Sequence, residues 1–241
     1  MSAWLFDLGN TRLKCAPLVD GRAGTVHALP NTPGGLADAL DAVLPARIDV
    51  AYVASVAGDA LRVELLDALV QRCRRIELAR TQAVFGGLRI AYATPARLGV
   101  DRFLAMLGAR GGIDDAVLVC GVGTALTLDL MDAGGRHLGG RIAPSPQLMR
   151  EALHARAAQL PVDGGAWVDW AVDTDDALAS GCMGAALALV RDARDSACAR
   201  LGSAPTLVLH GGGAAPLRER LADASWRPSL VLDGLARWAM E

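Results

Sequence analysis

The apolar residues of the first half of the chain fall into short runs separated by turn residues and by one helical pattern. The first run ends at Asp7 and Gly9 and resumes at Leu13, which predicts two strands joined by a tight turn. Between residues 33 and 44, Leu36, Leu40, Val43 and Leu44 recur at helical spacing. The elements predicted for this half are strands at 3–8, 13–18 and 25–29, a helix at 33–44, a strand at 50–56, a helix at 61–70 and a strand at 76–79.

The same plan begins again near residue 116, after an amphipathic helix that starts near residue 101. The elements predicted beyond that helix are strands at 116–120, 126–131 and 137–142, a helix at 146–157, a long helix at 175–201 and a strand at 207–209. Each half therefore reads as strand, glycine turn, strand, strand and helix, which indicates an internal duplication of architecture. We expect an α/β fold of two domains, residues 1–113 and 114–241, with a cleft between them.

Composition excludes several classes of function. The chain has 241 residues, is 52% hydrophobic and carries a net charge of −2 without long runs of one sign, so we expect no nucleic-acid partner. No apolar segment approaches the roughly 18 residues of a membrane helix. The five cysteines lack the spacing of a zinc site or a disulfide framework. A cytoplasmic protein is the simplest expectation.

The first turn, Asp7 to Lys14, has the groups that a nucleotide triphosphate needs. Its glycine, asparagine and threonine offer open backbone amides and a hydroxyl. Asp7 can hold Mg²⁺ directly or through water, and Lys14 supplies positive charge to a transferred group. The alternative is an ordinary hairpin in which Asp7 caps its own turn and Lys14 is solvated.

The second turn, Gly121 to Asp129, matches neither the P-loop nor the dinucleotide-binding glycine pattern, because the residues after its glycines are strand-like rather than helical. With Gly123 and Thr124 at its tip it resembles the first turn. Two such turns, one in each half, predict a phosphate clamp with two sides.

A third candidate element is Gly99-Val100-Asp101-Arg102, at the start of the amphipathic helix. Asp101 can accept a hydroxyl proton during phosphoryl transfer while Arg102 binds the carboxylate or amide of the acceptor. The alternative is that Asp101 is a helix N-cap and Arg102 is exposed. Thr174, between two aspartates, has the local pattern of an N-cap for the long helix.

Together these segments resemble type III pantothenate kinases over nearly the whole chain. The resemblance rests on short motifs in a fixed order: Asp7-x-Gly9-Asn10-Thr11-x-x-Lys14, Tyr92 with Gly99-x-Asp101-Arg102, Gly123-Thr124-Ala-x-Thr127-x-Asp129, Gly139-Gly140-x-Ile142-x-Pro144, Met149 to Leu153, Thr174 before Ser180-Gly181, and Gly211-Gly212. That family belongs to the acetate and sugar kinase/Hsp70/actin superfamily. The resemblance therefore implies two duplicated ribonuclease-H-like domains of the actin-like ATPase type.

The resemblance also implies an activity, ATP-dependent phosphorylation of pantothenate to 4'-phosphopantothenate, which is the first step of coenzyme A biosynthesis. Asp101 is the implied proton acceptor. The implied ATP-binding residues are Asp7, Leu8, Gly9, Asn10, Thr11, Arg12, Leu13, Lys14 and Thr124. The implied pantothenate-binding residues are Tyr92, Gly99, Val100, Asp101, Arg102 and Thr174. Members of the family are homodimers activated by Mg²⁺ and by K⁺ or NH₄⁺.

One departure from the family pattern bears on the monovalent cation. The family has an aspartate, a ligand of that cation, where this chain has Gly121, so a hard anionic ligand is missing. Two other functions stay open at this level. One is a catalytically silent regulator that keeps the fold, and the other is a kinase for another small hydroxy acid or sugar.

Overall fold

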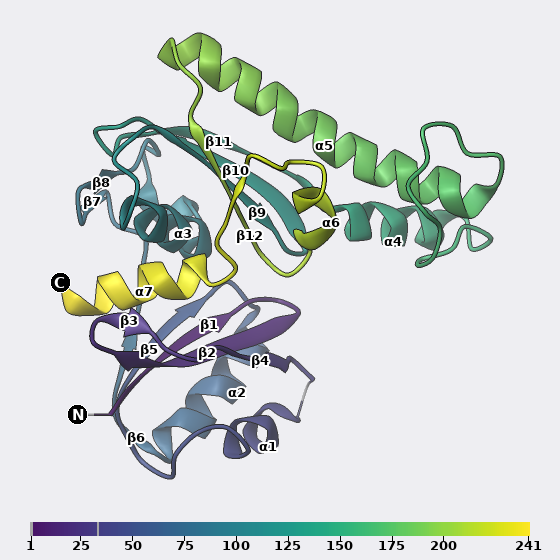
Figure 1. Ribbon diagram of the computed structural model, residues 1–241. Coiled ribbons are helices and arrows are strands. Elements are labelled where there is room, and N and C mark those ends of the chain that lie inside the picture. Colours follow the sequence, from purple (N-terminus) through teal and green to yellow (C-terminus); the bar gives the residue numbers. More distant parts are fainter. Residues whose placement is uncertain (1, 33) are drawn as a thin grey trace. The chain divides into compact units, whose positions relative to one another are not determined.

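In the computed structural model, which describes residues 2–32 and 34–241, the first apolar run becomes the central strand of a sheet (Figure 1). This strand, β1 (Ala3–Leu8), pairs antiparallel with β2 (Arg12–Val19) and parallel with β5 (Ile48–Ser55). The sheet has the order β3-β2-β1-β5-β6, and β4 also pairs with β2. The other strands are β3 (Arg22–Ala23), β4 (His27–Pro30) and β6 (Cys73–Leu78).

Alternation along β1 gives this sheet two different faces. Trp4, Phe6 and Leu8 point into a core closed by helices α1 (Leu36–Asp41) and α2 (Asp59–Val70). The helix predicted at 33–44 is shorter in the structure, where α1 extends from Leu36 to Asp41. The first residue of the predicted range, Pro33, lies outside the described residues. Asp7 belongs to the opposite face of the sheet.

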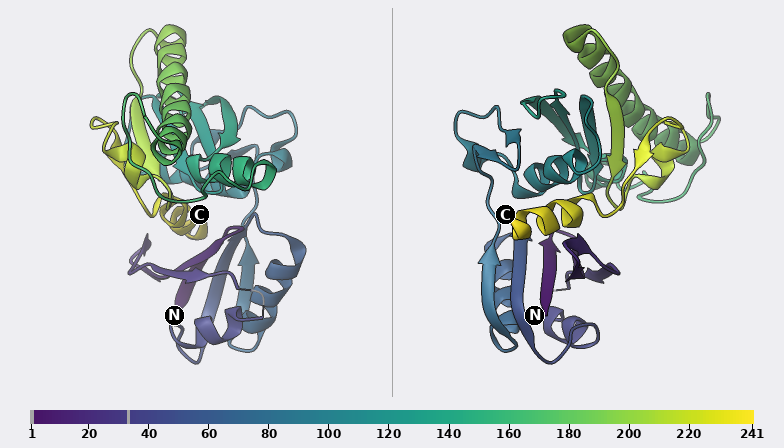
Figure 2. Two further views of the ribbon diagram at one scale, coloured as in Figure 1. Left: turned by 90° about the vertical axis from the view of Figure 1, so that its right-hand side faces the viewer. Right: turned by 60° about the vertical axis from the view of Figure 1, so that its left-hand side comes forward.

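The C-terminal helix α7 (Leu230–Met240) packs against β1 and its neighbours in this sheet and against α3 (Val100–Arg110) (Figure 2, yellow helix). The two helices approach closely at glycines. A Cβ atom added to Gly234 would lie 1.8 Å from the Leu104 carbonyl oxygen, and one added to Gly108 would lie 2.4 Å from the Leu230 oxygen. Only glycine permits this backbone contact.

A small hairpin also packs on α3. Its strands are β7 (Val84–Phe85) and β8 (Leu88–Arg89), joined by two glycines with positive φ, and a short 3-10 helix η1 (Pro95–Arg97) lies further along the chain. The Phe85 ring contacts the ring of Phe103 edge-on, with 6.2 Å between the centroids. The hairpin thus covers part of the helix that carries Asp101.

The second sheet has the order β11-β10-β9-β12-β13. Its strands are β9 (Val117–Val122), β10 (Ala125–Met131), β11 (His137–Pro144), β12 (Thr206–His210) and β13 (Ser225–Trp226). The accompanying helices are α4 (Pro146–Arg156), α5 (Thr174–Leu201) and α6 (Ala215–Arg218). Alanine and leucine side chains of α5 fill a core with Leu118, Cys120 and Val122 of β9. Figure 1 shows α5 running along this sheet.

The two sheets repeat one plan, in which the first strand lies third in the order, antiparallel to the next strand and parallel to a later one. This repetition agrees with the predicted duplication. The chain divides into unit 1 (Met1–Asp114, Gly134–His137 and Ser229–Glu241) and unit 2 (Asp115–Ala133 and Leu138–Pro228). The domain ranges 1–113 and 114–241 stay a prediction, but the packing of α7 within unit 1 differs from that simple division.

Every helix and strand expected from the sequence is present in the structure, with shifted ends. The elements that were not expected are β3, β7, β8, η1, α6, β13 and α7. None of the helices in the described residues is both long enough and apolar enough to cross a membrane. The five cysteines carry free thiols, and burial raises the pKa of Cys15 and Cys120 to about 12.

Candidate active site

The turn between β1 and β2 is held by backbone and side-chain hydrogen bonds. The Gly9 amide donates to the Arg12 oxygen at 3.1 Å, which closes the turn. Asn31, just after β4, donates from its side-chain Nδ2 to the Gly9 oxygen at 2.6 Å. Its backbone amide donates to the Thr11 oxygen at 3.2 Å. Sequence reasoning missed Asn31, because its contact with the turn depends on the pairing of β4 with β2.

Asp7 and Lys14 are directly opposite each other on β1 and β2. Their neighbours along each strand belong to the apolar core, so both charged side chains point to the other face of the sheet. Opposite charges at directly paired positions attract each other. On the other side of Asp7 the paired residue of β5 is Ala54.

The carboxyl group of Asp7 is strongly perturbed. Burial raises its pKa from 3.8 to about 7; the charge of Lys14 lowers it and that of Asp101 raises it. The influence of Asp101 shows that the two predicted site carboxylates lie near each other within unit 1. Perturbed carboxyl groups of this kind are typical of functional sites.

This raised pKa makes the stability of the ligand-free protein depend on pH. Because the folded state favours neutral Asp7, the contribution of Asp7 to the free energy of unfolding is greatest below pH 3.8 and is lost as the pH rises to about 7. We expect Asp7→Asn to raise the melting temperature by roughly 5 °C at pH 8, since an amide has no charge to bury. At pH 5 the increase in melting temperature should be less than half of the increase at pH 8. Calorimetry in the presence of a chelator measures both values.

Asp67→Asn is the control for this prediction, because Asp67 is exposed on α2 and its replacement should leave the melting temperature nearly unchanged at either pH. An equal gain at pH 5 and pH 8, or a loss of stability in Asp7→Asn at pH 8, would contradict the prediction.

Asp101 lies in the first turn of α3, where the helix dipole favours a negative charge. Its Oδ1 accepts a hydrogen bond from the Arg102 amide at 2.8 Å. The N-cap is Gly99, so the alternative interpretation of Asp101 as the N-cap is wrong. A Cβ atom at Gly99 would lie 2.6 Å from Oδ1 of Asp101, so this position must be small for the carboxylate to take this place.

Arg102 is not exposed, contrary to the alternative interpretation; only 7% of its surface is accessible. Its Nη1 donates to the Tyr92 hydroxyl at 3.4 Å. The Tyr92 ring stacks on the buried His137 ring with 6.0 Å between centroids. The structure therefore brings two of the predicted site residues, Tyr92 and Arg102, into contact.

Unit 2 contains the second glycine turn. Gly123 and Thr124 are exposed at the tip between β9 and β10, and the Gly123 amide donates to the Ala125 oxygen at 2.9 Å. The turn Gly211 to Gly213 packs against it, since the Gly213 amide donates to the Val122 oxygen at 3.0 Å. Gly211 has φ +97°, and a Cβ atom there would lie 2.3 Å from the Val122 oxygen. Two glycine loops thus meet at the end of β9.

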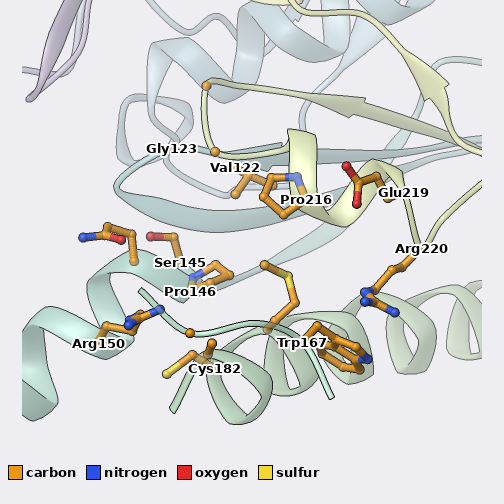
Figure 3. A pocket seen from close by; sticks show the side chains of 16 residues that line it. Val122, Gly123, Ser145, Pro146, Arg150, Trp167, Cys182, Pro216, Glu219 and Arg220 are labelled. Carbon is orange, nitrogen blue, oxygen red and sulfur yellow. The ribbon is translucent and has the colours of Figure 1, made fainter. Parts of the chain in front are cut away.

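These loops form one wall of a cavity of about 440 Å³ within unit 2 (Figure 3). Ser145, which caps α4, and Arg150 lie on another wall, and Cys182 and Trp167 line the part formed by α5 and the preceding loop. The Arg220 guanidinium lies 4.2 Å from the centre of the Trp167 ring. An aromatic and basic lining next to glycine loops suits a nucleoside with attached phosphates.

Thr174 is the first residue of α5. The N-cap is Asp173, whose Oδ1 accepts a hydrogen bond from the Asp176 amide at 2.9 Å, so the local prediction of Thr174 as the cap is wrong. The carboxylate wins because it reaches the free amide of the first turn. The Thr174 hydroxyl is therefore not needed as a helix cap.

The predicted site residues are divided between the two units. Unit 1 brings together Asp7, Lys14, Asp101 and Arg102 through the sheet face and α3. Thr124 lies in unit 2, in the turn beside the cavity. One unit thus holds charged groups suited to catalysis, and the other a cavity of nucleoside size.

The repeated sheets and paired glycine turns define a protein of the actin-like ATPase and sugar-kinase fold. A 2-dehydro-3-deoxygalactonokinase protein from Sinorhizobium meliloti shares this fold, with a TM-score of 0.59, 14% identity and coverage of 99% of each chain. A protein from Campylobacter jejuni described as a Baf family transcriptional activator has a TM-score of 0.62 and 20% identity, covering 96% of this chain and 94% of its own. The predicted fold class is confirmed.

Sequence comparison identifies the family. The profile of type III pantothenate kinases matches residues 4–195, and the chain belongs to this family. It is similar to the type III pantothenate kinase of Xanthomonas euvesicatoria pv. vesicatoria, with 56% identity over 239 residues and coverage of 99% of this chain and 98% of the relative. The enzyme of the same description from Stenotrophomonas maltophilia is 55% identical over 240 residues, covering 100% and 98%.

Proposed function

We propose that this protein transfers the γ-phosphoryl group of ATP to pantothenate, which yields 4'-phosphopantothenate and opens coenzyme A biosynthesis. Membership of the type III pantothenate kinase family supports the substrates. The single structural observation that carries the proposal is the position of Asp101, in the first turn of α3 and near enough to Asp7 for its charge to act on that carboxyl group. Phosphoryl transfer needs a positioned proton acceptor and a charged group for the phosphates, and both are in unit 1.

The acceptor side of the reaction depends on α3. Asp101 accepts the proton of the primary hydroxyl of pantothenate, and it lies in the first helical turn, where the helix dipole attracts a carboxylate. Arg102 binds the carboxylate or amide of pantothenate, with Tyr92 holding the guanidinium in place. Gly99 and Val100 contribute the backbone beside it, and we assign Thr174 to pantothenate as well.

The ATP side uses both glycine turns. The amides of the turn from Asp7 to Lys14 bind phosphate oxygens, and Lys14 stabilises charge on the transferred group. Thr124 contributes its hydroxyl, and the cavity beside it takes the nucleoside. Arg150 lines this cavity, and its Nη1 donates to the Gly164 oxygen at 2.8 Å, which fixes a positive charge beside the proposed nucleotide.

Mg²⁺ fits this arrangement through the phosphates. Among the residues described, no group of three or more His, Cys, Asp or Glu side chains gathers at one point, so this part of the chain has no closed metal cage. Mg²⁺ commonly keeps several waters and binds one or two carboxylates with substrate phosphates. Asp7, beside Asp101, is the carboxylate that would hold it, directly or through water. The ion would neutralise charge on the β- and γ-phosphates.

We further propose that the protein acts as a cytoplasmic homodimer. Support for a partner surface comes from the loop before α5, where Trp170 is 94% exposed and Val172 is fully exposed. Exposed apolar side chains that lie close together are one of the marks of a protein–protein interface. Both residues belong to unit 2.

A coupled assay of ADP release tests the proposed function. We expect turnover with ATP, Mg²⁺ and pantothenate and none when pantothenate is omitted, and ³¹P NMR should show a phosphomonoester as product. If folded protein binds ATP but releases no ADP with pantothenate, the proposal fails. A nucleotide-binding regulator, or a kinase for another hydroxy acid or sugar, then becomes the better account.

A further inference from the structure

A row of three residues crosses the second sheet beneath the glycine loops. Thr127 of β10 and His210 of β12 both stand directly opposite Gly121 of β9. The neighbours of these three residues along their strands belong to the apolar core, so the row lies on the other face of the sheet. The central position has no side chain, and its two neighbours flank the space above it.

The His210 ring occupies that space. A Cβ atom added to Gly121 would lie 2.7 Å from Nε2 and 3.0 Å from Cε1 of His210, and 2.8 Å from Oγ1 of Thr127. Real Cβ atoms essentially never show contacts below 3.0 Å, so any side chain at position 121 would displace the imidazole. Gly121 and His210 are therefore one structural unit, in which the histidine fills the volume that the glycine leaves.

This row lies where the phosphates of a nucleotide are expected. His210 is the last residue of β12 and directly precedes the Gly211 to Gly213 turn, while Gly121 lies two residues before Gly123. Ligands of parallel sheets bind at the carboxyl ends of the strands, and β9 and β12 are parallel. His210 remains partly exposed there.

The residues present do not fit a K⁺ or NH₄⁺ site at this position. A hard cation takes oxygen ligands and above all carboxylates, but position 121 has none. The neighbouring imidazole is a ligand for transition metals rather than for K⁺. The nearest rows offer one carboxylate on this face, that of Asp129 on β10, opposite Val119 and one row away.

We propose that His210 replaces the monovalent cation, so that this enzyme binds nucleotide and turns over without K⁺ or NH₄⁺. The inference rests on the proposed function. His210 acts as a positioning residue, because its ring supports the strand ends that carry both glycine loops of unit 2. The departure at Gly121 is thus compensated within the sheet rather than being a lost site.

Two quantities test this proposal. Each is measured once in KCl and once in choline chloride, at equal ionic strength. The first is the affinity for Mg²⁺ and the non-hydrolysable ATP analogue AMPPNP, by calorimetry, and the second is pantothenate-dependent ADP release. In the wild type we expect both to change by less than about twofold between the salts. A rise of roughly tenfold in either quantity with KCl would overturn the proposal.

Two variants make the test specific. His210→Ala empties the space, and we expect AMPPNP affinity in choline chloride to fall by roughly tenfold. Gly121→Asp combined with His210→Ala puts a carboxylate into the freed space, and we expect K⁺ to raise its AMPPNP affinity by roughly tenfold. His27→Ala, a histidine of β4 in unit 1, is the control and should behave like the wild type.

The outcomes separate the two proposals. Thermal unfolding within a few degrees of the wild type shows that each variant is folded. If His210→Ala and the double variant both match the wild type in AMPPNP affinity in both salts, the role of His210 is refuted. If affinities follow the expected pattern but no variant or wild type releases ADP with pantothenate, the proposed function fails and the assignment of His210 stands.

Discussion

Asp101→Asn should lower the kcat of pantothenate-dependent ADP release by a factor of about 10² to 10⁴, the range over which general bases contribute. The amide keeps the size of the side chain and can still accept the hydrogen bond from the Arg102 amide at 2.8 Å. It cannot take up the proton of the pantothenate hydroxyl. The KM values for ATP and pantothenate should therefore change much less than kcat, because the binding groups stay in place.

Asp59→Asn is a closely matched control for this prediction. Asp59 also lies in the first turn of a helix whose N-cap is a glycine, but it is exposed and pairs with Arg62 at 2.8 Å. Its replacement should leave kcat unchanged. If Asp101→Asn has a melting temperature near that of the wild type and retains more than about half of its kcat, Asp101 is not the proton acceptor.

Gly234→Ala should lower the melting temperature of the protein by roughly 5–10 °C. The added Cβ atom would lie 1.8 Å from the Leu104 oxygen and 3.1 Å from the Gly108 nitrogen, so it meets backbone that no rotamer change can move. Overpacking of this kind costs about 1–3 kcal/mol and occasionally more, which exceeds the gain of up to about 1 kcal/mol in helix propensity. The helices α3 and α7 must then separate.

Gly181→Ala supplies the matched control, because Gly181 is also helical but a Cβ atom there would meet nothing within 4 Å. Its melting temperature should stay the same or rise by a few degrees, since only the propensity term applies. Unchanged or increased stability in Gly234→Ala would show that α3 and α7 tolerate a wider separation. Differential scanning calorimetry at one pH compares all three proteins.

Local sequence patterns were sufficient for most strands and helices, because their apolar residues recur with the period of the element. The short apolar runs of β1 and β2 and the long, alanine-rich helical pattern of α5 predicted these elements closely. The missed hairpin had a usable signal, a pair of glycines between Phe85 and Leu88. The apolar spacing of residues 230–236 could likewise have indicated α7.

Contacts between distant segments could not be predicted in this way. Asn31 supports the first turn only because β4 pairs with β2, and the pKa of Asp7 is raised in part because α3 brings Asp101 near. Gly121 was recognised as a departure, but its partner His210 becomes visible only once β9 and β12 are paired. The predicted roles of the site residues in binding and catalysis stay predictions.

The placement of α7 affects the order in which the two units can fold during synthesis. Unit 1 contains both the earliest residues and Ser229–Glu241, whereas unit 2 is made almost wholly from one continuous stretch between them. Domains generally fold as units during synthesis, the N-terminal one first. Here the sheet of unit 1 is made before unit 2, but it lacks the helix that packs against β1 until Leu230–Met240 have emerged. The later-made unit can therefore finish folding before the earlier one, and the nascent sheet is exposed to chaperones throughout that interval.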